Sequence, residues 1–98
     1  MKEPIIVNEL FVKLPEDYED KYSIPLGIKV ILSGAFEDCS SLTNIELPNS
    51  VAEIGMFAFD NCPIQCFFVD KDNPNFTSVD GALFDMAKES IIRFPSGK

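Results

Sequence analysis

The sequence has no histidine and only three cysteines among its 98 residues. Without histidine, the Ser-His-Asp and Cys-His nucleophile arrangements, the commonest general base and the usual zinc ligand are all missing. Three cysteines are too few for the disulfide framework of a small secreted scaffold, and a closed zinc site needs four ligands. No nucleophile–base pair can be named. We therefore expect no enzyme, no catalytic residue, no metal ligand and no cofactor.

Basic residues are also scarce, with 8 Lys and Arg against 16 Asp and Glu, for a net charge of −8. Such a chain repels a phosphate backbone or an anionic lipid, so nucleic acid is not an expected partner. No apolar run approaches the roughly 20 residues that span a bilayer, and residues 1–7 are too short and too acidic for a signal peptide. We expect a soluble chain without membrane insertion.

The apolar residues are numerous enough for one folded domain, with 46% hydrophobic content and nine phenylalanines. They repeat along the chain, because residues 25–39 and 48–62 match at a constant offset of 23 positions. The matched pairs are Pro25 and Pro48, Ile28 and Val51, Ile31 and Ile54, Ala35 and Ala58, Phe36 and Phe59, and Cys39 and Cys62.

Later parts of the chain follow the repeat less strictly. After deletion of one residue behind Cys62, positions 64, 67 and 69 match Leu42, Ile45 and Leu47. A degenerate third copy has Val79 and Phe84 spaced like Ile54 and Phe59, and residues 91–95 close it as residues 44–48 close the first unit. A unit of about 20 to 29 residues forms a short strand and a turn or helical segment, and it buries its apolar face by stacking.

These residues resemble the BspA-like leucine-rich repeat family, whose units carry a Pro, spaced apolar positions, Ala-Phe, Cys and then Leu-x-x-Ile-x-Leu. The expected fold is an α/β-type repeat solenoid of about three coils, with short parallel strands on one face and turns or short helical segments on the other. The helical or 3₁₀ turns are placed at Gly34–Asp38 and Glu53–Phe59, with Ala-Phe packing inward. Residues 15–22 show no repeat partner, so residues 1–23 are interpreted as an N-terminal cap. The repeat units are then 24–47, 48–69 and a variant unit, 70–98.

The matched cysteines and one acidic loop each allow two interpretations. Stacked coils would bring Cys39 and Cys62 to about the 4.8 Å strand spacing, which permits a disulfide, but parallel buried thiols suit packing better. The loop 70–81 is acidic like a calcium loop, yet Asn75 and Gly81 stand where an EF-hand needs Gly and Glu. Its Asn-Pro and Asp-Gly pairs favour turns instead.

The candidate site is the outward side of the closing strands. The positions two before each closing Pro, or their equivalents, are expected to align as one row, flanked by polar residues. The row is Lys13, Glu46, Phe68 and Arg93, and the flanking residues are Thr43, Asn44, Gln65 and Cys66. An exposed aromatic among alternating charges is typical of a protein or peptide contact surface. The alternative is a plain solvated sheet with cross-strand pairs such as Lys13–Glu46.

Two functions follow from this surface. The first is a non-catalytic, adhesion-type module that binds a protein or peptide ligand; the second is a structural spacer, or a fragment of a longer array, with no ligand of its own. The resemblance implies a cell-surface or secreted protein of the kind found in bacteria and some protists, associated with adhesion to host or matrix proteins, whereas the residues themselves leave the localisation open.

Overall fold

The chain folds almost entirely as short strands and turns. The computed structural model describes residues 3–55 and 57–86 and the backbone of residues 90–93, and this part of the chain contains no helix. The strands are β1 (Ile5–Val7), β2 (Leu10–Lys13), β3 (Asp20–Ser23), β4 (Val30–Ile31), β5 (Leu42–Leu47), β6 (Glu53–Ile54), β7 (Cys66–Val69), β8 (Phe76–Val79), β9 (Ala82–Asp85) and β10 (Ser90–Arg93).

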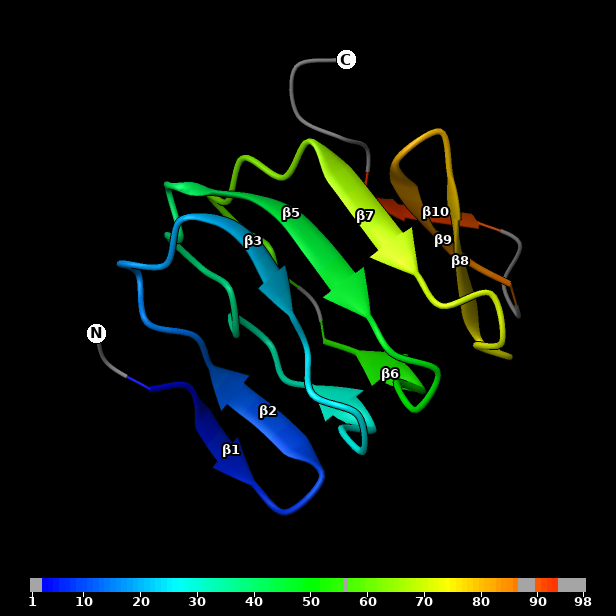
Figure 1. Cartoon of the computed structure of the whole chain (residues 1–98), viewed down its shortest axis with the longest axis horizontal. Helices are drawn as coiled ribbons and strands as arrows, with labels where there is room; N and C mark the ends of the chain where they lie inside the picture. The colour runs from blue at the N-terminus through cyan, green and yellow to red at the C-terminus, as the bar shows by residue number, and fades with distance from the viewer. Residues whose placement is uncertain (1–2, 56, 87–89, 94–98) are drawn as a thin grey trace.

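Two parallel arrays of strands enclose the core. Strands β2, β4 and β6 pair in parallel in one sheet, with β1 added antiparallel at the β2 edge, and strands β3, β5 and β7 pair in parallel in a second sheet. Figure 1 shows the second sheet nearest the viewer, with the N-terminal strands at one end and β8, β9 and β10 at the other. From β2 to β7, successive strands therefore alternate between the two sheets.

The strand register reproduces the sequence offset. Tyr22 pairs with Ile45, and Ile45 pairs with Phe67, so the step is 23 residues between the first two and 22 between the next two. The shorter second step is the one-residue deletion behind Cys62 that the sequence indicated. Ile45 and Phe67 are fully buried, because alternate side chains of a strand point to opposite faces of the sheet.

A column of aromatic rings runs through the core. The rings of Phe11 and Phe36 stack at a centroid distance of 5.1 Å, and those of Phe36 and Phe59 stack at the same distance. Ala35 and Ala58 precede these rings and are equally buried. The prediction that Ala-Phe packs inward is thus confirmed, and stacking of one unit on the next buries the apolar face that a single unit leaves exposed.

The predicted helical segments are wrong. Glu53–Ile54 is strand β6, and residues 34–38 and 57–59 form turns. A left-handed backbone at Gly34, Asp38 and Phe57 interrupts any right-handed helix. In addition, hydrogen bonds between units take the amides that a helix would use: Phe36 N donates to Ala58 O at 2.7 Å, and Gly55 N donates to Ile31 O at 2.7 Å. Both faces of the repeat therefore carry strands.

The two ends of the chain differ from the repeat pattern in opposite ways. Residues 20–22 belong to the stretch expected to have no repeat partner, yet together with Ser23 they form β3, which pairs in parallel with β5. The two-strand plan therefore begins before residue 24. At the other end β8, β9 and β10 form an antiparallel sheet, in which Val79 pairs with Ala82. The predicted equivalence of Val79 to Ile54 is therefore not found in the strand pairing, because Ile54 pairs with Ile31 of the preceding unit. The division of the chain at residue 23 stays a prediction.

Since the described part of the chain is free of helices, it offers no helical segment that could cross a membrane.

Candidate interaction surface

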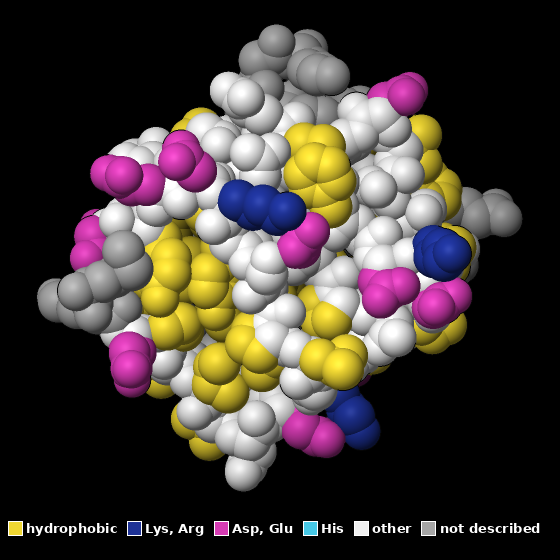
Figure 2. Space-filling model, in the orientation of Figure 1, with side chains coloured by type: hydrophobic (Ala, Val, Ile, Leu, Met, Phe, Trp, Pro, Cys, Tyr) yellow, Lys and Arg dark blue, Asp and Glu magenta, His cyan; other side chains and the backbone are white. Residues whose placement is uncertain are grey.

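The outward side of the β3-β5-β7 sheet carries two rows of side chains. Because Tyr22, Ile45 and Phe67 point to the core, the residues on either side of them point outward. We define the outer face by these six residues: Lys21, Asn44 and Cys66 in one row, and Ser23, Glu46 and Phe68 in the next. In Figure 2 a basic side chain near the middle of this face lies beside hydrophobic and acidic side chains.

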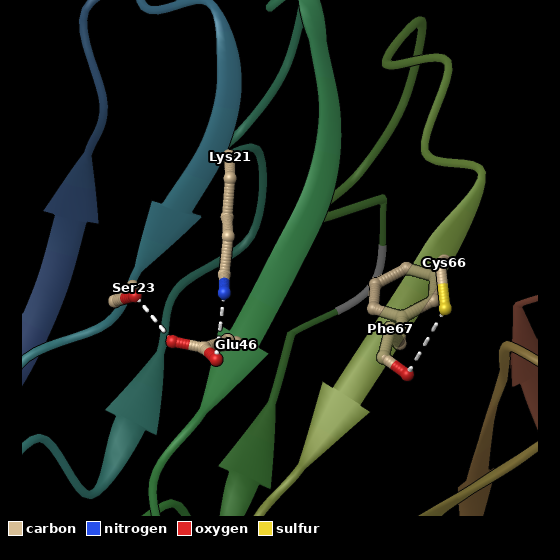
Figure 3. A network of polar contacts seen from close by, with 5 residues as sticks. All are labelled: Lys21, Ser23, Glu46, Cys66 and Phe67. Carbon is tan, nitrogen blue, oxygen red and sulfur yellow. Dashed lines mark hydrogen bonds and ion pairs between the residues drawn. The ribbon is translucent and has the colours of Figure 1, made fainter.

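Glu46 is the centre of a polar network on the outer face (Figure 3). Its Oε2 lies 2.9 Å from the Lys21 ammonium, and its Oε1 accepts a hydrogen bond from the Ser23 hydroxyl. The same ammonium lies 5.6 Å from the ring centroid of Phe68, within the range of a cation–π contact. Three neighbouring strands thus hold a carboxylate, an ammonium and an aromatic ring together.

The network keeps Glu46 ionised. Its pKa lies below the usual range, first because the Ser23 hydroxyl donates to the carboxylate, then because Lys21 also donates to it; partial burial opposes the shift. A carboxylate that accepts hydrogen bonds is stabilised in its charged form. The outer face therefore presents a fixed negative charge at neutral pH.

A groove lies where the three strands end, and we call it the Phe68 groove. It has a volume of about 320 Å³ and opens to solvent. Its walls include Ser23, Glu46, Pro48, Phe68, Val69 and Asp70. Phe68 is 46% exposed, whereas Val69 is half-buried against the core, so the groove has an apolar wall beside two carboxylates.

Six of the eight predicted row and flanking residues, Cys66 among them, lie on or beside the outer face. Glu46 and Phe68 are paired neighbours in one row, and Asn44 lies in the next. Thr43 is the extra residue where the β3–β5 register shifts, and its hydroxyl donates to Asp20 O at 3.1 Å. Gln65 is exposed just before β7, and its backbone N–H donates to the backbone carbonyl of Thr43 at 2.6 Å.

The other two predicted residues are not in the row, so the prediction of a four-residue row is wrong. Lys13 ends β2 in the other sheet, and its ammonium donates to Glu37 O at 3.0 Å and to Gly34 O at 3.4 Å. It therefore holds a turn and does not pair with Glu46. Arg93 lies in β10, where its backbone pairs with Leu83, and its side chain is outside the described residues.

The sequence reasoning missed Lys21, Ser23 and Asp70. The signal for the first two was present, since subtracting the offset of 23 from Asn44 and Glu46 gives Lys21 and Ser23. Lys13 was placed in the row because Leu14-Pro15 matches the strand ending Leu47-Pro48, but the first unit actually closes at Pro25, after β3. Asp70 follows the strand end directly, and its contribution to the groove depends on the turn that comes after it.

The cysteines and the acidic loop have structural positions. Cys39 and Cys62 are buried thiols, directed at the carbonyls of Leu14 and Leu42 at 3.8 and 3.9 Å. Burial raises the pKa of the Cys39 thiol, although nearby Lys13 opposes the shift. In the loop, Asp72 N donates to Asp70 Oδ1 at 2.9 Å, and residues 80–81 form a turn, as the Asp-Gly signal indicated. Residues 71–72 also form a turn, which lies just before the Asn-Pro pair, and Pro74 is in a bend.

Comparisons with known proteins agree with this repeated two-strand plan. A family model for the BspA type leucine rich repeat region matches residues 8–97 in 6 copies. The chain belongs to this BspA-type family. The crystal structure of the pneumococcal vaccine antigen PcpA has a similar fold, with a TM-score of 0.56 and 24% sequence identity over 78% of this chain. The match covers 25% of that chain, so this BspA-type chain spans about a quarter of its length. A search of curated proteins gave no match.

Proposed function

We propose that this BspA-type chain is a non-catalytic, adhesion-type interaction module that binds a protein or peptide ligand through the outer face of the β3-β5-β7 sheet. The observation that carries the proposal is Phe68, which is 46% exposed and is held beside the Lys21–Glu46 ion pair. Aromatic side chains are enriched at the cores of protein interfaces and often supply most of the binding energy.

The order of the surrounding side chains supports this use. Lys21 contacts both Glu46 and Phe68, so part of the conformational entropy that binding usually costs is already lost in the unbound chain. The groove beside Phe68 gives a ligand side chain a place to bury apolar surface. The proposal includes continuation of the two-sheet stack as a solenoid and a cell-surface or secreted location, as expected for the family.

The spacer is the second candidate, and one observation favours it. Ser23, Lys21 and Glu46 satisfy one another, so the outer face needs no ligand to complete its hydrogen bonds. A spacer would use this face only for solubility, and substitution of Phe68 would then affect no binding reaction.

Selection from a displayed library of random linear peptides tests the proposal. The wild-type chain is immobilised beside Phe68→Ala, and Phe57→Ala is the matched control because Phe57 is also exposed but lies in a turn outside the groove. We expect peptides that bind wild type and Phe57→Ala and lose at least about tenfold in affinity for Phe68→Ala, as an interface anchor does. No enrichment, or equal binding to all three chains, would support the spacer.

A further inference from the structure

The outer face already binds a cation within the chain. The Lys21 ammonium lies between the Glu46 carboxylate, at 2.9 Å, and the Phe68 ring, at 5.6 Å from the centroid. The quadrupole of an aromatic ring attracts a cation over its face, and a carboxylate adds direct charge pairing. Glu46 and Phe68 are therefore placed so that one cation contacts both.

The Phe68 groove offers a related environment beside the Lys21 contact. Glu46 and Asp70 line it, and among the residues that the structure describes its lining includes no lysine or arginine. Asp70 is fixed in place because its Oδ1 accepts a hydrogen bond from the Asp72 amide at 2.9 Å, and a carboxylate has further lone pairs for a ligand. Pro48 and Phe68 supply apolar surface beside these charges.

Charge and shape together indicate the occupant. Lysine and arginine bury their aliphatic stems on apolar surface and keep the charged group among polar partners. The chain as a whole carries a net charge of −8, which attracts a basic ligand and repels an acidic one. Lys21 already contacts Glu46 from outside the groove, so a basic ligand side chain would add a second cation beside Glu46 and would pair with the Asp70 carboxylate, whereas an acidic side chain would be repelled by both carboxylates.

We infer that the Phe68 groove receives an arginine or lysine side chain from an extended segment of a partner protein. The cationic group lies between the Glu46 and Asp70 carboxylates, and the aliphatic stem packs on Phe68 and Pro48. This inference rests on the proposed function and adds the chemistry of the ligand to it. Because the ionic contacts are exposed to solvent, binding depends on ionic strength.

An NMR titration of the full chain with defined peptides tests this assignment. The probe is an end-blocked peptide with one arginine among glycine and serine residues, and the matched peptide carries citrulline, which is nearly isosteric with arginine but uncharged. We expect the arginine peptide to shift the backbone amides of Glu46, Phe68 and Asp70 and the citrulline peptide to leave them unchanged. Added salt should weaken the arginine peptide's binding.

Two variants with matched controls separate the charge from the ring. Asp70→Asn removes the charge but keeps an acceptor for the Asp72 amide, and Asp72→Asn removes an exposed charge outside the groove. We expect about a two- to fivefold loss of affinity for Asp70→Asn, as for an exposed ion pair, and little change for Asp72→Asn. Phe68→Ala should lose a similar factor and Phe57→Ala should not.

The outcomes distinguish this inference from the function on which it rests. If library peptides depend on Phe68 but lack basic residues, and the arginine peptide gives no shifts, the interaction module stands and the cation site is wrong. Equal binding of the arginine and citrulline peptides, or shifts confined to other residues, would also overturn the cation site. If the library yields no peptide that depends on Phe68, the interaction module itself fails.

Discussion

Gly34 and Phe57 occupy the same position in successive units and share a left-handed backbone, with φ of 71° and 59°. Each lies in the equivalent turn of its own unit, because Glu37 N donates to Gly34 O and Asp60 N donates to Phe57 O. Glycine adopts this conformation without steric cost, but a residue with a side chain meets its own backbone there. Phe57 is 65% exposed, so its packing offsets little of that cost.

Replacing Phe57 should therefore reveal backbone strain. Phe57→Gly and Phe57→Ala lose the same ring, but only glycine relieves the left-handed conformation. We expect the glycine variant to have a free energy of unfolding about 1 kcal/mol higher than the alanine variant. Urea denaturation of both measures the difference. In the reverse substitution, Gly34→Ala should lower the free energy of unfolding by about 1 kcal/mol. This cost comes from the left-handed backbone alone, since the added methyl group would meet open space and no neighbour. Equal stabilities of the two Phe57 variants would contradict the strain.

Gly55 is constrained by close packing between units instead of by its backbone angle. A methyl group placed on Gly55 would collide with the backbone of Leu32 and Ser33 in the preceding unit, and Gly55 N donates to Ile31 O at 2.7 Å. Gly55→Ala must push its unit away from the preceding one, just beyond the ends of β4 and β6, so we expect it to destabilise the chain by about 2 to 3 kcal/mol. Chemical denaturation beside Gly34→Ala checks this. A smaller loss for Gly55→Ala than for Gly34→Ala would mean that the units separate easily.

The repeat could be predicted from the sequence because inward positions accept only one kind of residue. Phe36 and Phe59 stack directly on each other, so both units need a ring there and the offset is visible. The β2-β4-β6 sheet could not be predicted, because β4 and β6 have two residues each and so show no alternation. Their pairing depends on hydrogen bonds between units, such as Leu32 N to Phe11 O at 3.0 Å, which leave no trace in side-chain patterns.

The candidate site could be predicted only in part for a related reason. Outward residues have no packing constraint, so Ser23, Glu46 and Phe68 share a row without sharing chemistry. Glu46 and Phe68 were identified because they lie in the clearest units. Lys13 was placed in the row by a short Leu-Pro motif, although β2 belongs to the opposite sheet. The offset of 23 also places Ser23 beside Glu46, but it was missed because the repeat was taken to begin at residue 24.

Asn73 ties the acidic loop to the preceding unit and should be the most sensitive polar residue of the loop. It is 3% exposed, and its Nδ2 donates to Pro48 O at 2.9 Å and to Val51 O at 3.1 Å. Its Oδ1 accepts from Asn75 N and Phe76 N. Asn73→Ala leaves these groups without partners, so we expect a loss of about 2 to 4 kcal/mol in the free energy of unfolding. Thermal and urea unfolding measure it, with the exposed Asn49→Ala as control. A loss no larger than the control's would contradict the structural role.

The lowered pKa of Glu46 predicts how stability depends on pH in acid. Its carboxylate is stabilised by Ser23 and Lys21 in the folded chain, whereas an unfolded glutamate titrates near about pH 4.3. A depressed folded pKa adds stability above the unfolded pKa, and that stability is lost as the pH falls through the folded pKa.

Glu46→Gln should therefore be less stable than wild type near pH 7, and the difference should shrink as the pH falls below about 4. The side chain is 43% exposed, so solvent screening keeps the difference at pH 7 below about 1 kcal/mol. Urea denaturation across this pH range measures the difference, and Glu53→Gln, an exposed residue of the opposite sheet, corrects for the loss of one negative charge from an acidic chain. If the difference between wild type and Glu46→Gln is the same at pH 7 and in acid, the carboxylate contributes packing alone and the ion pair with Lys21 adds nothing to stability.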